Sequence, residues 1–322
     1  MLKKPKILVV GSLVMDLIAT TGRAPASGET VIGRTFRTAP GGKGANQAVQ
    51  CARLGAEVTL VGQVGDDCFG RELLEATHAA GVDVSHVSRD SACASGVGHI
   101  LVEVTDRGAQ NRITVVPGAN FTMQPKQLAW LETAIGAYDM LLLQLELPTD
   151  VVCAAADYAR RAGVPVMLNP APAAPLPAGL QVTYLSPNEQ EAATLTGLPL
   201  LRTADGIRQE DVARAAEALK QLGTEYVLLT LGADGAVFRD SGGLHRIPCV
   251  NMPRVADPTG AGDSFVAAFC TGVAGGLSHL EATTLAAHAA ALTVSRVGAM
   301  PSLPTRTEVG ELLRLRGVDG VL

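Results

Sequence analysis

Aromatic side chains are scarce in this chain: phenylalanine, tryptophan and tyrosine make up 3% of its 322 residues. A site that stacks a planar base on aromatic rings is therefore disfavoured. Charged residues are also few, at 18%, and their balance gives a net charge of −5. The chain thus lacks the basic stripe that a nucleic-acid-binding surface needs.

Paired metal or redox ligands are missing as well. The six cysteines include no Cys-x-x-Cys spacing, and no His-x-x-x-His pair occurs. Zinc sites and disulfide frameworks are therefore disfavoured, and reduced thiols in a cytosolic protein are the simpler interpretation.

No apolar run is long enough to span a membrane. The first residues loosely imitate a secretion signal, since Lys3, Lys4 and Lys6 precede an apolar run over residues 7–15. Asp16 closes that run without an Ala-x-Ala cleavage site. We therefore expect a cytoplasmic protein whose partners include neither a membrane nor a nucleic acid.

What the chain does have is apolar content, at 47%, which is enough for a large core. Short apolar strands alternate with helical stretches, and this pattern is typical of a parallel sheet covered on both faces. We predict one α/β domain over residues 1–322, with a doubly wound, mostly parallel sheet. The predicted strands are 7–10, 58–61, 140–145, 164–168, 182–185 and 226–231, and the predicted helices include 72–80, 151–161 and 212–222.

Two segments, residues 16–39 and 95–116, are strand-like and contain no helical pattern between their strands. The second is predicted to be a hairpin, with Ile100, Val102 and Val104 opposite Ile113 and Val115. Together the segments predict a small sheet beside the main one.

A helix is predicted to begin near Ala261, after a run of small residues. Its first N–H groups, from Gly260 to Asp263, form an anion site, because they have no acceptor within the helix. A carboxylate at that point, Asp263, suits a general base beside a phosphoryl group in transfer. The alternative is that Asp263 only complements the helix dipole.

A second helix is predicted to follow Gly41-Gly42-Lys43-Gly44-Ala45-Asn46. Glycine lets the backbone approach a ligand closely, and Lys43 and Asn46 add a cation and an amide that suit a polyhydroxyl substrate. The segment is not a Walker loop, because Gly44 follows Lys43 where Ser or Thr is needed. It also lacks the third glycine of a dinucleotide fingerprint.

These two segments resemble the signatures of the ribokinase-like family of carbohydrate kinases, which carry Gly-Gly-Lys-Gly-x-Asn near the amino end and Gly-Ala-Gly-Asp near the carboxyl end. The resemblance extends over nearly the whole chain, through Gly11-Ser12 with Asp16, Gln144-Leu145-Glu146, Asn169 to Ala173, Pro187-Asn188-Glu189 with Glu191, and Thr230-Leu231-Gly232. It is greatest for members that act on ribose or deoxyribose. It implies ATP-dependent phosphorylation of the primary 5-hydroxyl of a pentose, a β lid over the sugar that excludes water, and a homodimer formed through the lids.

The resemblance also assigns roles. Asp263 is the expected base, and the amides of Gly260, Ala261 and Gly262 hold the developing phosphoryl charge. The expected sugar-binding positions are Val14, Asp16, Gly41, Gly42, Lys43, Asn46 and Glu146. The expected ATP-binding positions are Asn188, Thr230, Gly232 and His288, although a lone helical histidine is as often a packed spectator.

Two metal sites are implied in the same way. Glu191 is expected to hold Mg²⁺ through water, with a plain first-turn helix acid as the alternative. Asp257, Thr259, Gly298 and Ser302 match a site for a monovalent cation, normally K⁺. Pro258 stands where many members carry threonine, so that cation site is expected to be slightly altered.

Val14 departs from the pattern of the ribose-phosphorylating members, which carry asparagine there. A valine cannot hydrogen-bond a 2-hydroxyl, and this predicts that 2-deoxyribose is used at least as well as ribose. The alternative is that Val14 points into the core.

Four other functions fit the sequence less well. A nucleoside kinase needs a base pocket that the few aromatic residues hardly provide, and a fructokinase-type activity fits the segments at residues 144–146 and 169–173 less well. A binding regulator without catalysis is disfavoured because Asp263 is intact. An NAD-dependent oxidoreductase is disfavoured because Gly11-Ser12-Leu13-Val14 is not a dinucleotide fingerprint.

Overall fold

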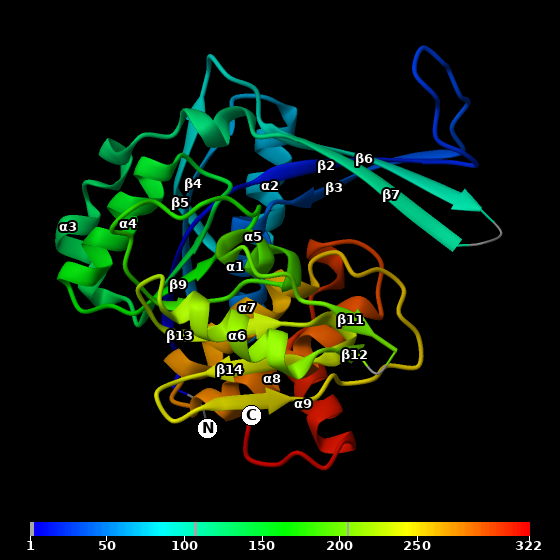
Figure 1. Ribbon diagram of the computed structural model, residues 1–322. Helices are drawn as coiled ribbons and strands as arrows, with labels where there is room; N and C mark the ends of the chain where they lie inside the picture. The colour runs from blue at the N-terminus through cyan, green and yellow to red at the C-terminus, as the bar shows by residue number, and fades with distance from the viewer. Residues whose placement is uncertain (1–2, 106–107, 205) are drawn as a thin grey trace.

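The computed structural model describes residues 3–105, 108–204 and 206–322, and it contains a main sheet with helices on both sides (Figure 1). The main sheet has nine strands in the order β15-β14-β13-β10-β9-β8-β1-β4-β5. In that order the strands are Leu244–Ile247, Ala236–Arg239, Thr224–Thr230, Val182–Leu185, Val166–Asn169, Met140–Gln144, Lys6–Val10, Glu57–Gly65 and Asp83–Asp90. Neighbours from β13 to β5 pair in parallel, whereas β14 and β15 run antiparallel at one edge.

The helices connect these strands and cover them. They are α1 Lys43–Arg53, α2 Cys68–Ala79, α3 Leu131–Ala134, α4 Thr149–Arg161, α5 Glu189–Thr196, α6 Gln209–Lys220, α7 Ala261–Ala274, α8 His279–Val294 and α9 Arg306–Leu315. Short 3₁₀ turns lie at η1 Gly118–Thr122, η2 Pro125–Leu128, η3 Ile135–Ala137, η4 Gly232–Asp234 and η5 Met300–Ser302, and a two-stranded ribbon joins β11 Arg202–Thr203 to β12 Gly206–Ile207. No helix of the described residues has the length and apolarity needed to cross a bilayer.

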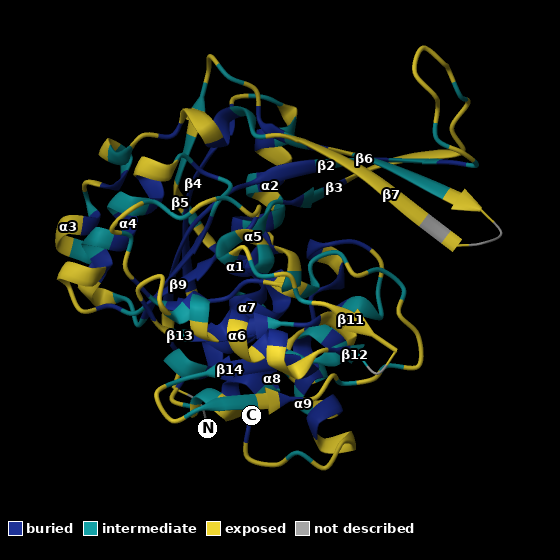
Figure 2. Cartoon of the chain, in the orientation of Figure 1, coloured by how far each residue is buried: buried dark blue, intermediate teal, exposed yellow. Residues whose placement is uncertain are grey.

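Alternate side chains of the central strand β1 enter two separate apolar clusters. Ile7 and Val9 pack with residues of α1, α7 and α8, whereas Leu8 and Val10 pack with residues of α4 and α6. Side chains of a strand point alternately to its two faces, so both faces of the sheet are covered. Figure 2 shows this burial along the strands in the middle of the molecule. The predicted doubly wound α/β fold is confirmed.

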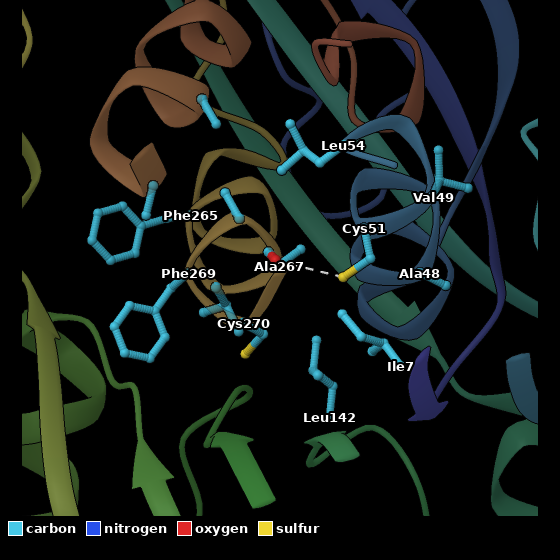
Figure 3. Close-up of a cluster of buried hydrophobic side chains, with 14 of the residues drawn as sticks. Ile7, Ala48, Val49, Cys51, Leu54, Leu142, Phe265, Ala267, Phe269 and Cys270 are labelled. Carbon is cyan, nitrogen blue, oxygen red and sulfur yellow. Dashed lines mark hydrogen bonds between the residues drawn. The ribbon is translucent and has the colours of Figure 1, made fainter. Parts of the chain in front are cut away.

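Helices α1 and α7 pack side by side on one face of the sheet (Figure 3). Cys51 of α1 points toward α7, and its thiol donates to the carbonyl oxygen of Ala267 at 3.5 Å. The start of α1 also lies close to the loop after β1, because a Cβ added at Gly44 would be 2.4 Å from the carbonyl carbon of Gly11. This packing places the start of α1 at the carboxyl end of β1 and holds α7 beside it.

A second sheet of four strands extends away from the main body (Figure 1). Its order is β3-β2-β6-β7, with β2 Val14–Thr21, β3 Thr35–Gly41, β6 Gly96–Thr105 and β7 Gly108–Val116. We call it the lid sheet. The predicted hairpin is present and Ile100 pairs with Ile113 as expected. The prediction for the other residues was wrong, since Val115 lies opposite Gly98, and Val102 and Val104 lie opposite Asn111 and Ala109. The side chain of Asn120 fixes the chain where it enters the lid sheet, because it accepts from the backbone N–H of Leu13 at 3.0 Å and donates to the carbonyl oxygen of Leu13 at 2.8 Å.

Candidate active site

A cavity of about 210 Å³ lies where the two glycine-flanked helices begin. It collects side chains from several elements that are far apart in the sequence. Its lining residues are Lys43, Asn169, Ala171, Ser186, Asn188, Glu191, Thr230, Pro258, Gly260, Gly262, Asp263 and Val266. Several of them follow the carboxyl ends of β9, β10 and β13, which is where ligands bind in open α/β sheets.

Asp263 lies in the first turn of α7 and is 7% exposed. Gly260 caps that helix with φ of 78°, a conformation that favours glycine. Each carboxylate oxygen of Asp263 accepts a hydrogen bond from α1: Oδ2 from Asn46 Nδ2 at 2.9 Å and Oδ1 from Gln47 Nε2 at 3.1 Å. The two predicted helix starts therefore meet at this carboxylate.

Oxygen acceptors gather at the start of α1, near Asp263. Glu146 Oε2 accepts from Ser12 Oγ at 2.5 Å and from the backbone N–H of Lys43 at 3.1 Å. The buried Oδ1 of Asn46 has no hydrogen-bond partner within the described part of the chain. A buried acceptor left without a donor is costly, so this atom is positioned for a donor such as a sugar hydroxyl.

Asp16 projects from the lid sheet toward the same acceptors. Burial raises the pKa of Asp16 to about 6, with a further contribution from the carboxylate of Glu146, partial opposition from Arg37, and a smaller contribution from Asp263. The end of β3 approaches Asp16 closely, since a Cβ added at Gly41 would lie 3.1 Å from Asp16 Oδ2. A side chain at this glycine would therefore crowd the carboxylate.

Val14 lies on the same face of β2 as Asp16, because the two are two residues apart on one strand. It is 5% exposed, yet it belongs to neither of the two apolar clusters. A Cβ added at Gly98 would lie 2.5 Å from Asp16 Oδ1 and 3.8 Å from Val14 Cγ1. This placement beside Asp16 favours a position at the sugar over a position in the core.

Lys43 is surrounded by carboxylates. Its burial lowers the pKa of the ammonium group, but the charges of Asp263, Glu146 and Glu191 outweigh that effect and raise the pKa above its ordinary value. Lys43 therefore stays a cation at the wall of the cavity, where a phosphate group would be attracted to it.

The nucleotide side of the cavity contains Asn188, Glu191 and Thr230. Asn188 and Glu191 form a capping box at the start of α5, in which each side chain accepts from the other residue's backbone N–H. Burial raises the pKa of Glu191, although the Asn188 N–H and the charge of Lys43 oppose it. Glu191 is thus both a helix cap and a cavity residue.

Two of the expected ATP positions do not line the cavity. Gly232 begins η4 just after β13, with φ of 56°. His288 is 5% exposed within α8, and its Nδ1 lies 2.8 Å from the carbonyl oxygen of Thr284 in the same helix. The packed-spectator interpretation of His288 fits this geometry better than contact with the cavity as it stands.

Asp257 ties the loop before α7 to the loop before η5. Its Oδ1 accepts from Thr259 N and Oγ1 at 2.9 and 2.6 Å, and its Oδ2 accepts from the backbone N–H of Gly298 at 2.9 Å. Burial raises the pKa of Asp257, but these hydrogen bonds outweigh it and hold the pKa below its ordinary value. Ser302 lies nearby in η5 and donates to the carbonyl oxygen of Ala299 at 2.7 Å.

Gln47, Gln144 and Ser186 were not predicted to belong to the site, whereas Asn169 was expected in the crevice at the strand ends but without a stated role. Asn169 and Ser186 line the cavity, and Asn169 Nδ2 donates to the carbonyl oxygen of Ser186 at 2.9 Å. The sequence feature that could have indicated Asn169 and Ser186 was their position at, or directly after, the end of a strand. Gln47 had only its place next to Asn46 as a signal.

Asp16→Asn is expected to raise the melting temperature of the sugar-free protein at pH 8, and by progressively less as the pH is lowered to 4.5. The folded-state pKa of Asp16, about 6, lies above its ordinary value of 3.8, so the cost of burying the charge accumulates as the pH rises from about 4 to about 6 and stays constant at higher pH. Thermal melts of the variant and wild type across this pH range measure the difference. The exposed Asp66 provides the control variant Asp66→Asn, and a stabilisation by Asp16→Asn that is independent of pH would contradict the prediction.

Comparison with known proteins agrees with this geometry. A model of the pfkB family of carbohydrate kinases matches residues 4–306. The chain is 39% identical to a ribokinase of Bacillus subtilis over 95% of its own length and 99% of the relative, and 31% identical to a deoxyribokinase of Salmonella typhimurium over 96% and 99%. Among solved structures, Arabidopsis thaliana ribokinase complexed with ribose and ATP is 34% identical, with a TM-score of 0.86 over 97% of this chain and 99% of that one.

Proposed function

Since the chain belongs to the pfkB family of carbohydrate kinases, we propose that it transfers the terminal phosphoryl group of ATP to the primary 5-hydroxyl of a pentose, ribose or 2-deoxyribose. The observation that carries this proposal is the meeting of α1 and α7 at Asp263. There, a carboxylate held by Asn46 and Gln47 lies at a helix N-terminus, beside a cluster of acceptors suited to hydroxyls.

In the proposed reaction Asp263 removes the proton of the 5-hydroxyl while that oxygen forms a bond to the γ-phosphorus of ATP. The bond between the γ-phosphorus and the bridging oxygen breaks, and its electron pair leaves with ADP. The N–H groups of Gly260 and Gly262 at the start of α7 are proposed to face the charge that develops on the phosphoryl oxygens. The N–H of Ala261, also expected there, donates instead to the carbonyl oxygen of Pro258 at 3.2 Å. Lys43 adds a positive charge at the same place.

Mg²⁺ is proposed as the companion of ATP. The nucleotide side of the cavity offers it the carboxylate of Glu191 and the amide oxygen of Asn188, and Mg²⁺ usually keeps several waters, so few protein ligands are needed. The described residues contain no cluster of three or more His, Cys, Asp or Glu that could hold a metal ion. The ion would neutralise charge on the phosphates.

A monovalent cation, K⁺, is proposed at the loop that Asp257 organises. The carboxylate is ionised and retains lone pairs beyond its three hydrogen bonds, and such oxygens suit a hard cation. A cation there would stiffen the loop that carries the α7 N-terminus. Pro258, next to Asp257, removes one backbone donor from the loop.

A homodimer through the lid sheet is also proposed. The face that carries Asp16 continues into an apolar surface in which Ile113 is 54%, Val115 49% and Val104 38% exposed. Such a continuous apolar face is costly in water and fits a second copy of the same face.

The double variant Ile113→Asp, Val115→Asp is expected to sediment as a monomer where the wild type sediments as a dimer. Like charges on this surface would face each other across the two-fold axis. Sedimentation velocity at micromolar concentration measures the difference. A wild type that stays monomeric at such concentrations would contradict the lid dimer.

An ADP-release assay tests the proposed function directly. Ribose, 2-deoxyribose, fructose and nucleosides are compared, each with and without K⁺. We expect the pentoses to give the highest kcat/KM and K⁺ to raise it. A nucleoside as the best substrate would instead identify a nucleoside kinase, and sugar binding without ADP release would identify a binding regulator.

A further inference from the structure

Gln47 is a fully buried residue of α1 whose side chain contacts Asp263 directly. Its carboxamide uses all of its polar atoms. Nε2 donates to Asp263 Oδ1 at 3.1 Å and to Asn169 Oδ1 at 3.2 Å, and Oε1 accepts from Gln144 Nε2 at 2.6 Å. Gln47 therefore lies at the centre of a network that ends at the carboxylate.

The direction of these hydrogen bonds follows from the carboxylate. An ionised Asp263 can only accept, so the amide nitrogen of Gln47 must face it and the amide oxygen must face Gln144. Gln144 must then present its nitrogen, and its own Oε1 is left buried without a partner within the described part of the chain. Space for that oxygen depends on Gly11, because a Cβ there would lie 2.2 Å from it. The glutamine pair is thus held in one arrangement.

On the basis of the proposed function, we infer that Gln47 is a positioning residue that fixes the orientation of the Asp263 carboxylate for proton removal. A carboxylate can rotate about its terminal torsion, and one donor on each oxygen prevents this. Asn46 restrains Oδ2 and Gln47 restrains Oδ1. With Gln47 in place, a lone pair of the carboxylate stays aimed at the sugar hydroxyl, and small misplacements of such a group lower the rate steeply.

Three charged groups face Asp263, and the hydrogen bonds of Gln47 go to Asp263, Asn169 and Gln144 rather than to them. The three groups are Lys43 on α1, Asp16 on β2 and Glu191 on α5. Replacing Gln47 therefore removes a hydrogen bond to the Asp263 carboxylate without removing any of these charges.

The test is Gln47→Met, which keeps most of the side-chain volume and removes the amide. We expect kcat to fall by about 10- to 100-fold, with KM for sugar and ATP within about twofold of wild type. In the Asp263→Asn background the same change should lower kcat by less than about twofold, because the group that Gln47 orients is gone. The matched control is Gln50→Met, one turn along α1. Gln50 is equally buried and bonds to Ser264 and Pro304, not to Asp263, so its loss should leave kcat unchanged.

Several outcomes would overturn the inference. One is a wild-type kcat for Gln47→Met, and another is an equal fold-loss in both backgrounds, which would indicate a purely structural role. If Asp263→Asn alone leaves kcat unchanged, the base assignment in the proposed function fails first, and the inference fails with it. If Gln47→Met does not fold, Gln144→Met replaces it, since Gln144 holds Gln47 from the far side. In that case we expect Gln144→Met to lower kcat when Asp263 is present, by less than the factor expected for Gln47→Met, and to have little effect on kcat in the Asp263→Asn background. An unchanged kcat for Gln144→Met with Asp263 present would overturn the inference.

Discussion

Asp263→Asn lowers kcat by about 10²–10⁴-fold, the usual size of a general-base effect, while ATP binding is preserved. The asparagine keeps the size of the side chain but cannot take a proton from the 5-hydroxyl. The N–H groups at the start of α7 and the charge of Lys43 remain, so the nucleotide site is retained. Single-turnover rates with ribose measure the loss, and calorimetry with ADP measures nucleotide affinity.

The chain offers a closely matched control for this variant. Asp211 is also buried, at 6% exposed, and stands at the same third position of its helix, α6, but it accepts from Leu201 N far from the cavity. Asp211→Asn should therefore change stability without changing kcat. Near-wild-type turnover of Asp263→Asn would remove Asp263 from its assigned role and leave only a helix-dipole function for it.

Val14→Asn raises the preference for ribose over 2-deoxyribose, as the ratio of the two kcat/KM values, by roughly 5- to 150-fold. The factor corresponds to roughly 1–3 kcal/mol for a buried hydroxyl that gains a hydrogen-bond partner. Val14 lies beside Asp16 and outside both apolar clusters, so an asparagine there would face the sugar. In the proposed complex of the wild type, the 2-hydroxyl of ribose would find no partner at Val14, and 2-deoxyribose would lose nothing there.

The control for Val14→Asn is a valine on the opposite face of the lid sheet. Val97 pairs with Met15 and packs against the core, so Val97→Asn should lower stability and leave the sugar ratio unchanged. Initial rates with both sugars at saturating ATP measure the ratio. An unaltered ratio for Val14→Asn would mean that the 2-hydroxyl lies away from this residue, and the sugar preference would then have another origin.

Much of the fold could be predicted because its signals are local. The apolar strands and the helical spacing after them lie within short windows, and the predicted strands at 7–10 and 182–185 match β1 and β10 closely. The antiparallel edge formed by β14 and β15 was not predicted, since the choice of a neighbour in a sheet is not encoded in any one strand. The start of α7 at Ala261 was predicted, because glycine and the first apolar position mark it.

The sequence by itself determined which residues begin helices on glycines, where the apolar strands lie, and that Asp263 and Asn46 each stand near a helix N-terminus. Only the tertiary structure decided that these two side chains touch and that Gln47 holds the second oxygen of Asp263. The physical reason is the separation along the sequence of the residues that must come together. A helix start depends on a few consecutive residues, whereas contacts across more than 200 positions depend on how α1 and α7 pack on the sheet.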